Sequence, residues 1–137
     1  MRLIKFLSVA FSIALLAACN QSNGWKLLTT FNGGNAYYFI SNDHSYSKDE
    51  ASIQLIYDEP QNLNIQGNSS VTYTSKESTI IFECPTKTFI MPDYSYHNKS
   101  TVVHWVSIPP NEVIHNEIKN DDIALKLIEK LNPTCIK

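Results

Sequence analysis

Arginine is almost absent from this sequence: the 137-residue chain contains one, Arg2, and all its other basic residues are lysines. Arginine supplies the planar, two-pronged donor that matches phosphates and base edges, and lysine does not reproduce that geometry. Without its first eighteen residues the chain keeps nine lysines against thirteen acidic residues, a side-chain net charge of about −4. We therefore expect no nucleic-acid partner.

Signatures of catalysis are also missing. The chain has only four glycines and contains no GxxxxGK[ST], GxGxxG, GxSxG or HExxH motif. Asp43, His44 and Ser45 are the residue types of a hydrolytic triad, but triads are assembled by geometry, and neighbours in a turn seldom point at each other. These three residues fit a polar loop better. We expect no catalytic residues, and the chain is not predicted to be an enzyme.

Metal sites are not indicated either. Helical metal sites pair histidines at fixed spacings, and no two histidines of this chain are spaced that way. The four are His44, His97, His104 and His115. We expect no metal and no cofactor.

The first eighteen residues have the layout of a signal peptide. Arg2 and Lys5 form a basic start, and an apolar or small run follows over residues 6–16. That run is shorter than the ~20 residues that span a bilayer. It ends in Leu-Ala-Ala-Cys at residues 16–19, which resembles the lipobox of bacterial prolipoproteins. An ordinary cleaved signal with a chance cysteine is the alternative.

The lipobox resemblance implies that the Cys19 thiol carries diacylglycerol and that its freed amine is acylated, for instance with palmitate. Several acyl chains anchor a protein stably, whereas one does so marginally. Residues 19–24 would be a lipidated tether, and the domain would span residues 25–137. Asn20 follows the lipidated cysteine. Lipoproteins retained in the inner membrane carry Asp at that position, so Asn20 resembles the residue of a lipoprotein sorted to the outer membrane. We expect an outer-membrane location, on either the periplasmic or the surface face.

Two cysteines remain when Cys19 is assigned to lipid. Cys84 and Cys135 form an even pair, which in an oxidising envelope compartment predicts one disulfide. A metal pair and a redox pair are the alternatives. Neither cysteine belongs to a CxxC motif, and no histidine flanks either closely. The disulfide is the favoured interpretation.

The rest of the chain predicts short strands and one helix. Alternating apolar residues and turn signals give seven strands, and a hairpin turn is expected at 32–35. Breaks or loops are expected at 58–60, 62–70, 76–77 and 93–101, and an amphipathic helix at 122–131 is stopped by Pro133. The fold class is α+β: a curved antiparallel sheet of six or seven short strands with the C-terminal helix packed on it. The expected strands are 26–31, 36–41, 52–57, 71–75, 78–84, 87–91 and 102–108.

The polar segment 93–101 is the candidate binding loop. It carries Tyr94, Tyr96 and His97 among Asp, Ser and Asn residues, where no core demands aromatic side chains. Exposed tyrosine gives a large, rigid contact area at low entropic cost, which suits protein recognition. The alternative is an aromatic lid that packs back onto the sheet.

The order of several short motifs resembles the bacterial surface-adhesin protein E family of small lipoproteins. The match covers roughly residues 25–135, in which Tyr37-Tyr38 comes first and the strand ending at Cys84 comes next. The Trp105 to Pro109 segment and the terminal Cys135 complete it. Two features depart from the family pattern. Thr74 occupies a position where the family commonly has Arg, and the final segment, residues 110–135, is long for the family. The resemblance implies the curved sheet and helix, a Cys84–Cys135 disulfide, a homodimer, and binding to host extracellular proteins. A non-adhesive accessory lipoprotein facing the periplasm is the alternative.

Overall fold

The structure, a computed structural model, describes residues 24–40, 49–67 and 69–137. The predicted signal peptide, Cys19 and the segment with Asp43, His44 and Ser45 lie outside these residues. Within the described residues, no helix has the length and apolar character needed to cross a membrane.

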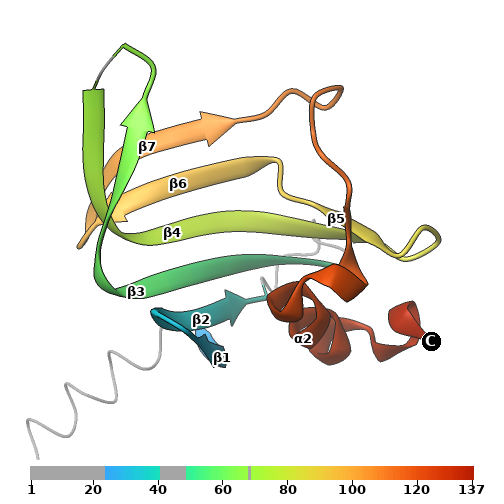
Figure 1. The fold of residues 1–137 in the computed structure, drawn as a ribbon. Helices are drawn as coiled ribbons and strands as arrows, with labels where there is room; N and C mark the ends of the chain where they lie inside the picture. The colour runs from blue at the N-terminus through green and yellow to red at the C-terminus, as the bar shows by residue number, and fades with distance from the viewer. Residues whose placement is uncertain (1–23, 41–48, 68) are drawn as a thin grey trace, which may run out of the picture.

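The described residues form one eight-stranded antiparallel sheet with a C-terminal helix on it, so the predicted fold class is confirmed (Figure 1). The strand order is β1-β2-β3-β4, after which β4 pairs with β5 near its end and with β6 at its middle. On their other sides β5 pairs with β8, and β6 pairs with β7. The strands are β1 (Lys26–Phe31), β2 (Gly34–Phe39), β3 (Glu50–Ile65), β4 (Ser69–Glu83), β5 (Thr88–Ile90), β6 (Asp93–Asn98), β7 (Thr101–Ser107) and β8 (Asn116–Glu117).

The β1–β2 hairpin forms where the Asn-Gly signal predicts it, although β2 starts earlier than expected, at Gly34. Gly33 takes the positive φ of 108° that glycine adopts without a side-chain clash. Gly34 is required for a second reason. A Cβ there would lie against the carbonyl oxygen of Ile56 on β3 and 3.0 Å from the Phe31 ring. The missing side chain lets β2 approach β3 and lets Phe31 reach across it.

The predicted breaks in the centre of the sheet are wrong, because β3 and β4 form one long hairpin. Pro60 does not end β3. It falls within a bulge, where the pairing with β4 shifts between Ile56 and Gln61. A proline is tolerated there because its missing N–H is not needed for a hydrogen bond between the strands. The predicted loop 62–70 pairs in register as far as Ile65 and Ser69. Lys76 and Glu77, expected at a turn, instead pair with strands on both sides.

Helix α2 (Asp122–Leu131) forms as predicted. Its N-cap is Asp121, whose side-chain oxygen accepts a hydrogen bond from the Ala124 N–H at 2.9 Å. Its apolar stripe packs on one face of the sheet, together with Ile118 of the 3₁₀ turn η1 (Ile118–Asn120). The buried core contains Ala51, Ile53, Ile80, Phe82, Phe89, Ile118, Ala124, Leu127 and Ile128.

A disulfide joins the end of β4 to the chain beyond the helix. Cys84 and Cys135 are bonded, with their Cα atoms 4.9 Å apart, so the predicted disulfide is confirmed. Cys135 lies in the 3₁₀ turn η2 (Pro133–Ile136). The bond holds α2 on the sheet at the end where β4 meets β5.

Candidate binding site on the helix-side face

The prediction of a loop at 93–101 is wrong. Its first six residues are strand β6, which hydrogen-bonds with Ser75 to Ser78 of β4, and a tight turn connects β6 to β7. Lys99 occupies that turn with a φ of 57°. The Tyr-Ser-Tyr alternation over 94–96 is a strand signal, and pairing satisfies the backbone groups that β4 would otherwise leave open.

The strand separates the three residues of the predicted binding loop. Tyr94 and Tyr96 pair across from Ser78 and Lys76, and so they lie on the face that carries α2, here called the helix-side face. His97 lies on the opposite face. Its Nε2 is 2.8 Å from Ser95 Oγ and 3.9 Å from the Glu77 carboxylate. The site therefore includes both tyrosines and excludes His97.

Five ring side chains form a continuous row across the helix-side face, here called the aromatic row. Neighbouring ring centres are 6.0, 5.6, 4.9 and 5.9 Å apart, and the first three contacts are edge-to-face, a favoured geometry for aromatic pairs. All five side chains are only partly buried. In order from β1 to β7 the row is Phe31, Tyr57, Tyr73, Tyr96 and His104.

Lys76 lies beside this row on β4. Its Nζ is 4.3 Å from the centre of the Tyr94 ring and 5.4 Å from that of Tyr96, within the range of cation–π attraction. Among the described residues no carboxylate forms an ion pair with it. Burial lowers the pKa of the Lys76 amine, because the charged form loses hydration.

Burial also raises the pKa values of three tyrosine hydroxyls on this face. Burial is the largest cause for Tyr57, Tyr94 and Tyr96, and nearby acidic groups add to it. These hydroxyls therefore stay neutral through the physiological range, and they offer donors and acceptors beside partly exposed rings.

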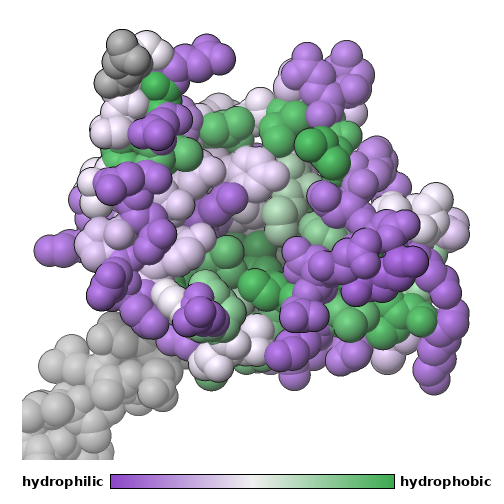
Figure 2. Space-filling model, in the orientation of Figure 1, coloured by the Kyte–Doolittle hydropathy of each residue, from purple (hydrophilic) through white to green (hydrophobic). Residues whose placement is uncertain are grey.

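Lys76 lines a hollow between the sheet and the start of α2, here called the Lys76 hollow. Its volume is about 90 Å³. Figure 2 shows hydrophobic side chains gathered at its floor beside the helix. The polar groups on its wall are Lys76, Ser78 and Asp121, and the apolar ones are Ile53, Leu55, Ile80, Met91, Ile123 and Ala124. The Asp121 carboxylate is already engaged in capping α2.

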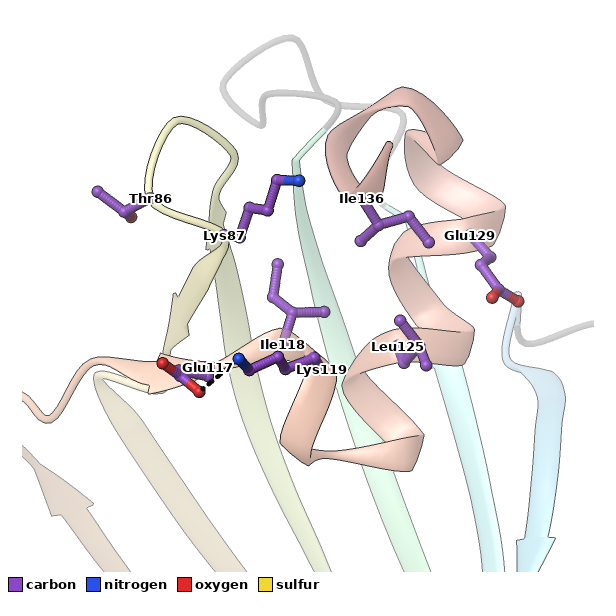
Figure 3. A pocket seen from close by; sticks show the side chains of 8 residues that line it. All are labelled: Thr86, Lys87, Glu117, Ile118, Lys119, Leu125, Glu129 and Ile136. Atoms are coloured by element: carbon purple, nitrogen blue, oxygen red, sulfur yellow. Dashed lines mark ion pairs between the residues drawn. The ribbon is translucent and has the colours of Figure 1, made fainter.

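A larger cleft, of about 590 Å³, lies between α2, η1 and the β4–β5 turn (Figure 3). Ile118, Leu125 and Ile136 supply its apolar surface. Its lysines already have partners. Lys119 pairs with Glu117 at 3.6 Å, and Lys87 Nζ donates to the backbone oxygen of Lys137 at 3.1 Å. Because both lysines already have partners within the chain, this cleft is a weaker candidate for binding an anionic group than the Lys76 hollow is.

The other candidate residues do not form a reactive cluster in the described part of the chain. His97 and His104 lie on opposite faces of the β6–β7 hairpin, and His115 contacts Glu83 at 3.1 Å. No three metal-binding side chains come together among the described residues. The sequence did not predict the aromatic row, because its five side chains come from five separate strands.

No family model, curated protein or solved structure matches this chain. The resemblance to the surface-adhesin protein E family therefore stays a prediction.

Proposed function

We propose that this chain is a lipid-anchored protein of the bacterial outer membrane that binds a macromolecular partner without catalysis, through its helix-side face. The observation that carries the proposal is the aromatic row, five partly exposed rings in mutual contact beside the half-buried Lys76. Rigid aromatic surface and a desolvated cation are typical of protein-recognition surfaces.

The anchor is supported by the basic start, the apolar run and the Leu-Ala-Ala-Cys segment. The test is metabolic labelling of cells with a palmitate analogue. We expect label on the wild-type chain and none on Cys19→Ser, which should also remain unprocessed. Label that persists on Cys19→Ser would contradict lipidation at this residue.

The binding function is tested with the chain lacking residues 1–19, applied to immobilised extracellular-matrix proteins and to isolated cell envelopes. Saturable binding in one format, weakened by Tyr96→Ala, is the expected result. Failure to saturate in both formats would refute a binding function.

Protease treatment of intact cells decides between an adhesin and an accessory protein. Digestion on intact cells supports a surface adhesin for host extracellular proteins. Protection until the outer membrane is permeabilised supports a periplasm-facing partner within the envelope.

A further inference from the structure

We infer that the Lys76 hollow receives the carboxylate of an aspartate or glutamate side chain from a protein partner. This inference rests on the proposed binding function and names the contact through which the partner is held.

Lys76 carries a charge that no carboxylate neutralises among the described residues. A cation that has lost part of its hydration is stabilised by a nearby anion. Here Lys76 Nζ has two tyrosine rings at 4.3 and 5.4 Å, but no ion-pairing carboxylate among the described residues. Ring faces attract a cation more weakly than a carboxylate does. An incoming carboxylate would complete the pair while Tyr94 and Tyr96 hold the ammonium in place.

The Lys76 hollow is too small for a whole ligand and fits a single side chain. The hollow measures about 90 Å³, whereas pockets that enclose whole small molecules measure about 300–1,000 Å³. That volume is about three times the share of one liquid water, which suits a carboxylate on a short apolar stem. The partly exposed apolar residues of its wall, such as Leu55 and Met91, can contact the stem methylenes. The entering group is therefore one side chain of a larger ligand.

The charges around the hollow favour a protein partner over an acidic polysaccharide. A polyanion is bound by clusters of cations, but Asp121 shares the wall of this hollow with Lys76. The chain without residues 1–18 also carries about four net negative charges. The aromatic row beside the hollow, from Tyr96 to Phe31, provides a surface for the apolar and aromatic side chains around a single acidic residue.

The test uses the full-length chain, purified from membranes in mild detergent. A displayed library of random dodecapeptides is selected on the wild type alone, and the winners are then measured on Lys76→Met, which keeps most of the length of the side chain and removes its charge. Winning peptides are synthesised with their Asp or Glu, and again with Asn or Gln. Lys130→Met, which removes a charge from an exposed helix position, is the matched control.

We expect winners that share an acidic residue and bind Lys76→Met roughly tenfold to a hundredfold more weakly, because a charge-assisted contact is lost. The amide version of each peptide should lose a similar factor on the wild type, a result that does not depend on how the variant folds. Binding to Lys130→Met should be unchanged, and bound peptide should protect Lys76, but not Lys130, from acetylation.

Three outcomes would overturn the inference: no enriched peptides, equal binding of the acid and amide versions, or binding only of a sulfated polysaccharide used as a competitor. Peptides that lose binding on Tyr96→Ala but not on Lys76→Met would refute the carboxylate contact and leave the proposed binding face intact. Peptides that tolerate both substitutions would count against both proposals.

Discussion

The two ends of β4 differ in how far other parts of the chain cover them. Near Cys84 the strand is covered: Ile80 and Phe82 are 0% and 4% exposed, α2 packs over them, and a disulfide closes the end. Toward Tyr73 the same face has no helix over it and carries partly exposed rings and Lys76. Figure 1 shows α2 beside one end of the sheet only. We therefore expect the stability of the fold to depend mainly on the covered end, and the proposed binding surface lies at the open end.

The largest effect is expected at the covered end, from removing the disulfide. Replacing Cys84 and Cys135 with Ser should lower the free energy of unfolding by about 4 kcal/mol, because the bond restricts the unfolded chain between residues 51 positions apart. Urea denaturation of the chain lacking residues 1–19 measures it. A loss below about 1 kcal/mol would show that α2 needs no covalent tie.

Truncating the helix stripe should have the next largest effect. Leu127 is fully buried, so Leu127→Ala should cost about 3 kcal/mol through lost contacts and the cavity left behind. Leu27→Ala is the matched control, because Leu27 is 55% exposed, and it should change stability by less than about 0.5 kcal/mol. Equal losses in the two variants would contradict the placement of the core.

Gly34→Ala tests how the open end is assembled. The added methyl would meet the Ile56 carbonyl and crowd Phe31, and overpacking of this kind costs about 2 kcal/mol. Denaturation of Gly34→Ala beside Asn35→Ala measures the effect. We expect the neighbouring substitution to be nearly neutral, and wild-type stability of Gly34→Ala would show that β2 and β3 are farther apart than described.

The smallest expected effect is a change in stability at alkaline pH. Burial raises the folded-state pKa values of Tyr57, Tyr94 and Tyr96 above the ordinary value of 10.0. Above that pH the unfolded chain loses these protons first, so the contribution of the tyrosines to stability falls as pH rises through their folded pKa values. The lowered pKa of Lys76 has the opposite sign and offsets part of this fall. Phenolate absorbance and urea denaturation across this range test both. Tyrosines that all ionise at 10.0 would contradict their burial.

Local signals were enough to predict much of the covered end. The apolar stripe of the helix and the stop before Pro133 are encoded within one short segment, and both form as predicted. The Asn-Gly turn of the first hairpin is equally local. The cysteine pair could be predicted because only two cysteines remained once Cys19 was set aside.

The open end could not be predicted in the same way because its contacts are distant in sequence. Lys76 resembled a turn residue, yet it lies in the middle of β4 because β3 and β6, which are distant in sequence, pair with it on both sides. Pro60 resembled a strand end, yet a bulge accommodates it. Tyr94 and Tyr96 were identified as candidate binding residues, but their neighbours in the aromatic row, such as Tyr73, come from other strands.

Equilibrium binding of two matched variants tests the central claim most directly. Tyr96→Ala removes a ring from the open end, and Leu125→Ala opens the cleft beside α2. Both variants are measured on the immobilised matrix protein or the envelope preparation that the wild type binds saturably. We predict that Tyr96→Ala binds about tenfold more weakly and that Leu125→Ala binds as the wild type does. If Tyr96→Ala keeps the affinity of the wild type and Leu125→Ala loses binding, the partner binds at the cleft beside α2 and not at the open end.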